Sequence, residues 1–173
     1  MSNKILVCYA SRTGSTGGVA EAIGKTLAES GAQVEVRSMK DVQHLAPYRA
    51  VVAGSAIREG RWLPEAMQFM RTHQATLAQK PFAAFLVCIT LAMPNADKYR
   101  EGVTTWLEPV RALVKPVSEG LFAGALDCSK LSLIPDGLSM RAAVAFGIFP
   151  QGDHRDWNAI RAWATDLQSF LAA

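Results

Sequence analysis

A turn rich in hydroxyl side chains and glycine, near the start of the chain, contains residue types that bind phosphate. It comprises Ser11, Arg12, Thr13, Gly14, Ser15, Thr16 and Gly17. The turn follows an apolar run at 5–9 that is typical of a buried strand, and it precedes Val19, Ile23 and Leu27, which share one helical face. The N–H groups and dipole of a helix start, together with nearby hydroxyls, favour an anion. The stretch therefore predicts a phosphate-binding turn between a strand and a helix.

Two common phosphate motifs do not fit this turn. No Gly-Lys-Ser/Thr triplet follows it, which excludes the nucleoside-triphosphate loop, and the G-x-G-x-x-G spacing of dinucleotide-binding folds is missing. Gly14 and Gly17 would let the backbone approach a phosphate without a Cβ in the way. The alternative interpretation is an ordinary helix N-cap, in which Ser15 or Thr16 accepts hydrogen bonds from backbone N–H groups.

The turn resembles the flavodoxin signature, a Ser/Thr-x-Thr-Gly-x-Thr sequence after the first strand. Ser11, Thr13, Gly14 and Thr16 occupy the matching positions. In flavodoxins this turn binds the single phosphate of FMN. The resemblance therefore implies an FMN cofactor whose phosphate is held by residues 11–16.

A flavin also needs apolar surfaces for its ring and groups at its polar edge that decide which redox states are stable. Ile57, Trp62 and Leu91 could supply the surfaces, and Arg58 or Arg61 could place a charge at the edge. For Trp62 the alternative is packing on the core at a helix start. For either arginine alone, the alternative is a solvated position in a loop.

Composition restricts the class of protein. The chain has 173 residues, half of them hydrophobic, which suits one domain with a large core. The three cysteines are far apart and the three histidines are isolated, so the sequence predicts no disulfide framework, no metal site and no catalytic side-chain constellation. The net charge is +3 and the pI about 8.9. Because the basic residues are scattered, no nucleic-acid partner is expected.

No membrane-spanning segment is expected, because no apolar run approaches about 18 residues. A strand that begins near Lys4 leaves no room for a secretory signal. We therefore expect a cytoplasmic protein, with membrane association left open.

Strand and helix patterns alternate along the chain. Strands are expected at about 5–9, 33–37, 50–54, 82–89 and 120–124, and helices at about 15–30, 64–77, 99–113 and from 156 onward, with a short, poorly marked helix at 39–45. Pro109 should kink or end the third of these helices. The alternation predicts a single α/β domain, 1–173, with a doubly wound, flavodoxin-like parallel sheet of five strands in the order 2-1-3-4-5. In that order the loops at 11–17, 55–62 and 90–95 meet at one edge.

Two further segments resemble the flavodoxin-type, menaquinone-dependent protoporphyrinogen dehydrogenases. Residues 51–60, VVAGSAIREG, are similar to that family's third strand and the Ser-Ile-Arg-x-Gly run after it. Residues 122–126, FAGAL, are similar to its fifth strand, and an inserted segment at about 127–153 then precedes the pair Asp156-Trp157. Together, the loops and the resemblance add Ala56, Thr90 and Gly124 to the expected cofactor-binding residues.

The resemblance implies an FMN-dependent oxidoreductase. It would take electrons from a small hydrophobic substrate, such as a porphyrinogen, and pass them to a quinone or a redox protein. A flavodoxin-type electron carrier, disfavoured by the basic pI, and a flavin-free interaction module of the same fold remain alternatives. The apolar run at 138–146 in the insertion either packs on the domain's own core or on a second subunit, or contacts a hydrophobic substrate, quinone or membrane surface.

Overall fold

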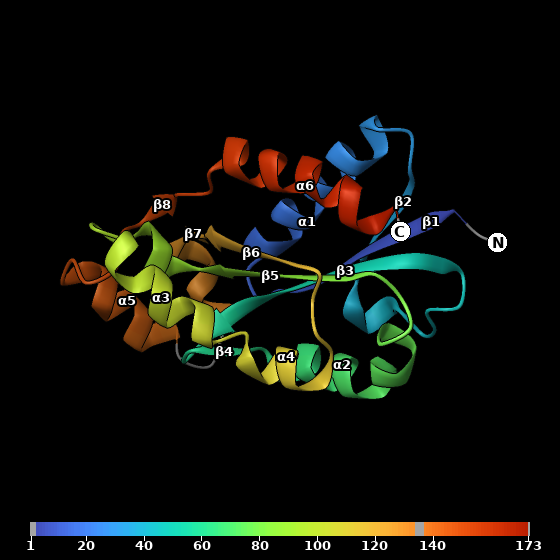
Figure 1. Ribbon diagram of the computed structural model, residues 1–173. Coiled ribbons are helices and arrows are strands. Elements are labelled where there is room, and N and C mark those ends of the chain that lie inside the picture. The colour runs from blue at the N-terminus through green and yellow to red at the C-terminus, as the bar shows by residue number, and fades with distance from the viewer. Residues whose placement is uncertain (1–2, 134–136, 173) are drawn as a thin grey trace.

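Five parallel strands form the centre of the molecule (Figure 1). The computed structural model describes residues 3–133 and 137–172. The strands are β1 (Lys4–Ala10), β2 (Gln33–Ser38), β3 (Tyr48–Arg58), β5 (Phe82–Cys88) and β6 (Ser118–Ala123). They lie in the order β2-β1-β3-β5-β6, and each neighbouring pair is parallel. The predicted α/β class and the order 2-1-3-4-5 are confirmed, with β5 and β6 as the fourth and fifth predicted strands.

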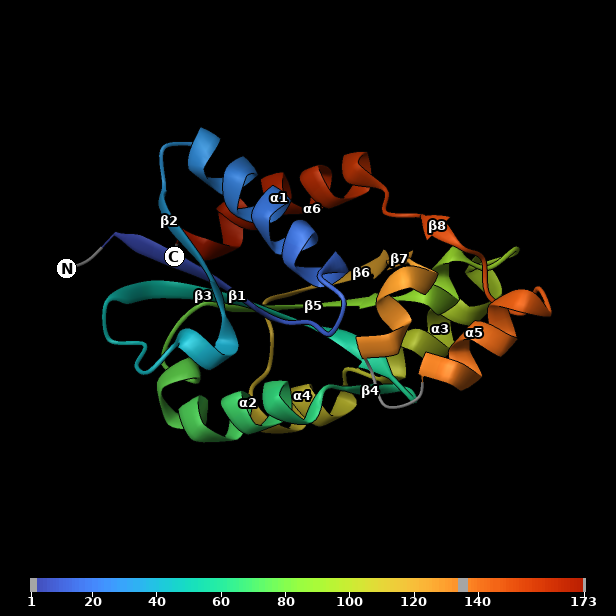
Figure 2. The same ribbon diagram turned by 180° about the vertical axis from the view of Figure 1, so that it is seen from behind.

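Helices cover both faces of the sheet (Figures 1 and 2). The helices α1 (Ser15–Glu29) and α6 (Trp157–Leu171) pack against each other on one face, whereas α2 (Pro64–Leu77) and α4 (Glu108–Leu113) lie on the other. The sheet therefore separates two apolar clusters. Val7, Ile23 and Phe85 belong to the cluster under α1 and α6, and Leu6 and Met70 belong to the cluster above α2.

The segment 55–62 is a hairpin and not the expected loop. Strand β3 continues to Arg58, and the two-residue strand β4 (Arg61–Trp62) pairs antiparallel with it. The turn residues Glu59 and Gly60 both have positive φ angles, 50° and 71°, as in the hairpin turns that match strand twist. The sequence hid this strand end because Ala56, Ile57 and Arg58 are only partly buried and lack the continuous apolar pattern of a covered strand.

The helix expected at 99–113 is divided into α3 (Asp97–Thr105) and α4. Pro109 lies in the first turn of α4, where its missing N–H breaks no helical hydrogen bond. The predicted interruption at Pro109 is therefore confirmed. The helix expected at 39–45 is only one turn of 3₁₀ helix, Met39–Asp41.

The inserted segment forms a small substructure at the carboxyl end of the sheet. It contains a 3₁₀ helix (Cys128–Leu133), α5 (Gly137–Ala145) and β8 (Gly152–Asp153), and β8 pairs antiparallel with β7 (Ala125–Leu126), which directly precedes the insertion. In Figure 1 it lies at the end of the molecule away from the two chain termini. Pro135, one of the residues that bracket the apolar run at 138–146 in the sequence, lies outside the described residues.

Helix α5 does not pack its large side chains on the domain's own core. Leu138 is 84% exposed, and Phe146 and Ile148, which lie just after the helix, are 83% and 54% exposed. The first alternative for this run is packing on the domain's own core or on a second subunit, and its core half is therefore wrong; packing on a second subunit stays a prediction. The apolar surface faces solvent at the same end of the molecule as the predicted phosphate turn.

Candidate cofactor site

The predicted phosphate turn connects β1 to α1. Gly14, directly before the helix, has a φ of 94°, a left-handed conformation that favours glycine. Its N–H donates to Oγ of Ser11 over 2.9 Å, which closes the turn. The first N–H groups of any helix lack partners within the helix. This end of α1 therefore offers donors to an anion.

Thr16 provides the observation that fits a phosphate best. Its side chain is fully buried, and within the described part of the chain its Oγ1 has no hydrogen-bond partner. Leaving a buried polar atom unpaired costs about 1–3 kcal/mol, so such a hydroxyl is expected where a ligand supplies the partner. Thr26, later in the same helix, instead donates to the carbonyl oxygen of Ala22 over 2.9 Å. The turn thus fits a phosphate group.

A cavity of about 160 Å³ lies beside the turn. Its wall combines turn residues with residues in or near the insertion: Thr13, Gly14, Ser15, Ala125, Asp127, Lys130 and Arg155. The first three were predicted from the sequence as cofactor-binding residues. The other four are more than a hundred residues away along the chain, and no local spacing marks them. The insertion therefore forms part of the wall of the site.

Arg155 holds the insertion against the start of α1. Its Nη1 donates to the carbonyl oxygen of Ser15 over 3.2 Å, while Nε and Nη2 donate to the two carboxylate oxygens of Asp153 over 2.8 and 2.6 Å. The guanidinium carbon lies 4.5 Å from the ring centroid of Trp157. These hydrogen bonds lower the pKa of Asp153 below its ordinary value. Sequence reasoning missed Arg155, although it directly precedes the Asp156-Trp157 pair.

Arg12 is directed away from the turn. Its guanidinium forms a two-point ion pair with Glu65 in the first turn of α2, with distances of 2.8 and 3.1 Å. The sequence predicted Arg12 as a cofactor-binding residue but gave no reason to expect Glu65 beside it. In this structure the partner of Arg12 is a carboxylate of the protein.

The hairpin places Ala56, Ile57 and Arg58 at partly buried positions. Trp62, which pairs with Ile57, is only 3% exposed and packs in the core cluster on the α2 side. Its ring is therefore covered and does not offer a free face to a flavin, which corrects the expectation from sequence. The alternative interpretation of the sequence, in which Trp62 packs on the core at a helix start, describes the position of this residue.

The third predicted loop contains a 3₁₀ helix, Ile89–Ala92, directly after β5. Thr90 is partly buried, and Leu91 is 9% exposed. Gly124 lies one residue beyond β6 and is buried, with its N–H donating to the carbonyl oxygen of Cys88 over 3.0 Å. This backbone hydrogen bond joins the segment before the insertion to the end of β5, so the structure gives Gly124 a structural role.

The chemistry of the remaining side chains is limited. In residues 3–133 and 137–172, no three His, Cys, Asp or Glu side chains are grouped so that they could hold a metal ion. Burial raises the pKa of Cys88 to about 11, so this thiol is protonated at neutral pH.

None of the helices that the structure describes has the length and hydropathy needed to cross a membrane.

The sequence model of a protein family described as "Flavodoxin domain" matches residues 6–136, which is more than half of the chain. The chain belongs to this flavodoxin family. The resemblance deduced from Ser11, Thr13, Gly14 and Thr16 is thereby confirmed. The match ends within the insertion, so the flavodoxin family model does not describe α5 or β8.

Relatives of this flavodoxin domain include enzymes and flavodoxins. A protoporphyrinogen IX dehydrogenase [quinone] from Leishmania major is 26% identical over 184 residues, covering 99% of this chain and 78% of the relative. Oxidised Flavodoxin 2 from Bacillus cereus is 27% identical with a TM-score of 0.54, covering 83% of this chain and 99% of its own. A flavodoxin from Streptococcus pneumoniae is 14% identical with a TM-score of 0.59, covering 96% and 98% of the two chains, and shows the shared fold. Proteins of the flavodoxin family bind a flavin.

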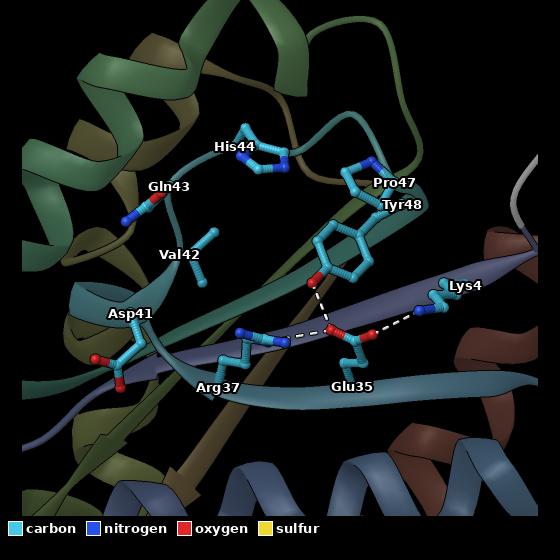
Figure 3. Close-up of a pocket in the computed structure, with 9 residues that line it drawn as sticks. All are labelled: Lys4, Glu35, Arg37, Asp41, Val42, Gln43, His44, Pro47 and Tyr48. Atoms are coloured by element: carbon cyan, nitrogen blue, oxygen red, sulfur yellow. Dashed lines mark hydrogen bonds and ion pairs between the residues drawn. The ribbon is translucent and has the colours of Figure 1, made fainter.

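A second cavity, of about 360 Å³, lies along the edge strand β2 (Figure 3), and no residue of the flavodoxin turn lines it. Within it the Glu35 carboxylate accepts hydrogen bonds from Lys4 over 2.8 Å, from Arg37 over 3.1 Å and from Tyr48 over 2.6 Å. These contacts, first of all the one with Lys4, lower the pKa of Glu35 to about 2. Figure 3 shows the three donors converging on this carboxylate from β1, β2 and β3.

We expect Glu35→Gln to lower the free energy of unfolding by roughly 1 kcal/mol at neutral pH, since solvent screens this partly exposed group. The folded-state pKa of about 2 lies below the ordinary 4.5. The carboxylate therefore stabilises the fold above pH 4.5, and this contribution is lost as the pH falls towards 2. Urea unfolding of both proteins over this range should show their difference shrinking. A difference that stays constant would contradict the assignment.

Proposed function

We propose that this flavodoxin domain, as a single domain 1–173, binds FMN at the carboxyl end of its sheet and is an FMN-dependent dehydrogenase. Its substrate would be a small hydrophobic molecule of the porphyrinogen class, and its electron acceptor a quinone or a redox protein. The observation that carries the cofactor assignment is the buried, unpartnered hydroxyl of Thr16. The name of the Leishmania relative supports the substrate and acceptor classes.

Each part of the site would have a separate task. The hydroxyls of Thr13 and Thr16 and the first N–H groups of α1 would hold the FMN phosphate. Ile57, which is partly buried at the end of β3, would offer apolar surface to the flavin ring, and Leu91, which is 9% exposed after the neighbouring β5, would offer only an edge. Arg58 brings a positive charge to the β3–β4 hairpin, which also contains Ile57. A nearby positive charge favours an anionic form of a bound group. FMN, when bound, supplies the acceptor for the electrons of the substrate.

The exposed side chains of the insertion favour an enzyme that handles an apolar partner. Leu138, Phe146 and Ile148 stand in solvent at the end of the molecule that holds the phosphate turn. Exposed apolar surface of this kind is expected where a protein contacts a hydrophobic ligand, another subunit or a membrane surface. The alternative function, a flavodoxin-type electron carrier, is supported by the solved flavodoxins that share the fold.

Binding and turnover assays separate these functions. Titration of FMN with the purified protein should quench flavin fluorescence at a one-to-one stoichiometry, with FAD and a nicotinamide dinucleotide binding more weakly. A protein that binds no flavin would be an interaction module and would contradict the proposal. Turnover of a porphyrinogen with a quinone by the FMN-loaded protein would support a dehydrogenase. Flavin binding without any such turnover would favour the carrier.

We expect Leu138→Ser combined with Phe146→Ser to lower kcat/KM for a hydrophobic quinone by about tenfold, or about 1.4 kcal/mol, because the quinone would bury each side chain only in part and full burial of one contributes about 1.5–3 kcal/mol. FMN affinity and melting temperature should not change, since both side chains are more than 80% exposed. The matched control is Phe170→Ser, which alters a 47% exposed ring on α6. An unchanged kcat/KM in the double variant would exclude a role for α5 in partner contact.

A further inference from the structure

The ion pair between Arg12 and Glu65 joins two segments that lead to opposite faces of the sheet. Arg12 lies in the turn before α1, which covers one face of the sheet, and Glu65 lies in the first turn of α2, which covers the other face (Figures 1 and 2). Nη1 of Arg12 is 2.8 Å from Oε1 of Glu65, and Nη2 of Arg12 is 3.1 Å from Oε2 of Glu65. The pair therefore lies where the connections after β1 and β3 diverge, the place where ligands bind in doubly wound folds.

This ion pair is weak enough to be replaced. The side chains of Arg12 and Glu65 are 42% and 40% exposed, and exposed pairs of this kind contribute about 0.2–1 kcal/mol. A phosphate monoester carries a charge of about −1.5 to −2 at neutral pH. Its oxygens match the fork of a guanidinium, as a carboxylate does. A phosphate held in the turn that contains Arg12 is therefore a stronger partner for Arg12 than Glu65 is.

Glu65 does not depend on Arg12 for its own stabilisation. It follows Pro64 at the start of α2, where the helix dipole favours a negative charge. Loss of the ion pair would therefore leave Glu65 at a favourable position. The cost of releasing Arg12 is correspondingly small.

We propose that Glu65 competes with the phosphate of the flavin for Arg12, so that this pair tunes the selectivity of the site for FMN over riboflavin. In the free protein Glu65 holds Arg12. When the phosphate enters the turn, Arg12 leaves Glu65 and binds the phosphate. The inference rests on the FMN binding proposed above, and it adds Glu65, which belongs to no phosphate motif, as a residue that sets affinity.

Dissociation constants of FMN and riboflavin for wild type and three variants test the competition. Glu65→Gln frees Arg12 and should bind FMN about 1.5- to fivefold more tightly, with riboflavin affinity unchanged. Arg12→Gln should bind FMN about tenfold or more weakly, because a hydrogen bond to a charged group is lost. In the double variant Arg12→Gln/Glu65→Gln, the gain from the Glu65 change should disappear, which is the coupling that a double-mutant cycle measures.

Glu119→Gln is the matched control. It breaks the two-point ion pair between Arg111 of α4 and Glu119 of β6, in which Nε and Nη2 lie 2.7 and 2.6 Å from the two carboxylate oxygens. This change should leave FMN affinity unchanged. Equal or weaker FMN binding by Glu65→Gln would overturn the inference. So would an equal gain for riboflavin, or a gain that persists in full without Arg12. If the wild-type protein binds no FMN, the proposed function itself fails. That result differs from the three outcomes above, in which the wild-type protein still binds FMN.

Discussion

Thr16→Val is expected to weaken FMN binding by roughly 10- to 100-fold without destabilising the free protein. In the free protein the Thr16 hydroxyl is buried and has no partner among the described residues, so a valine of the same shape removes an uncompensated polar atom. In the complex the hydroxyl would donate to the phosphate, and a hydrogen bond to a charged group contributes about 1.5–3 kcal/mol. Fluorescence titration with FMN and thermal unfolding of the flavin-free protein measure the two effects.

Thr26→Val is the matched control for this change. Thr26 lies in the same helix and is also buried, but its hydroxyl donates to the carbonyl oxygen of Ala22. The control should leave FMN affinity unchanged, because Thr26 lies about three turns into the helix from the phosphate turn. Wild-type FMN affinity in Thr16→Val, or a marked loss of stability in its flavin-free form, would show that the hydroxyl has another role.

Gly54→Ala is expected to cost about 3 kcal/mol or more of unfolding free energy, and it could prevent folding. Gly54 lies in the middle of β3, and a Cβ built there would be 2.1–2.3 Å from three ring atoms of Phe85 on the neighbouring strand. Phe85 is fully buried, so its ring has no space to move into. Urea unfolding monitored by circular dichroism would measure the loss.

A second substitution keeps this prediction testable if Gly54→Ala does not fold. The double variant Gly54→Ala/Phe85→Leu removes the ring that the new methyl group meets, and it should recover part of the lost stability. Gly102→Ala serves as the contrast, because a Cβ there has no neighbour within 4 Å and lies inside α3. It should raise stability by about 0.5–1 kcal/mol. Similar losses at both glycines would refute the steric explanation.

The sheet could be predicted from sequence because its signal is local. Each central strand is buried on both faces, so runs such as 5–9 and 82–88 are apolar throughout, and the helices between them require parallel strands. The phosphate turn was also readable, since its hydroxyls and glycines are contiguous at 11–17. In each case the residues that define the element are close neighbours in the chain.

The contacts that shape the site could not be predicted in this way. Arg155 meets Ser15 across a separation of 140 residues, and Arg12 meets Glu65 across 53. Such pairs leave no periodic pattern in the sequence. The end of β3 was missed because its partly exposed residues resemble a loop, and the burial of Trp62 depends on its pairing with Ile57 in that hairpin. Local patterns therefore located the site, but tertiary contacts determine which side chains face it.

The first and last described residues lie at the same end of the molecule, away from the phosphate turn (Figure 1). Asn3 and Ala172 line one cavity of about 260 Å³ at the amino end of the sheet, whereas the turn lies at the carboxyl end of β1. A short linker between residues 3 and 172 would therefore leave the phosphate turn uncovered, and a chain joined in this way could be opened in an exposed loop. The same arrangement would let the protein be tethered to an electrode or a sensor surface by either end, with its phosphate turn facing the solution.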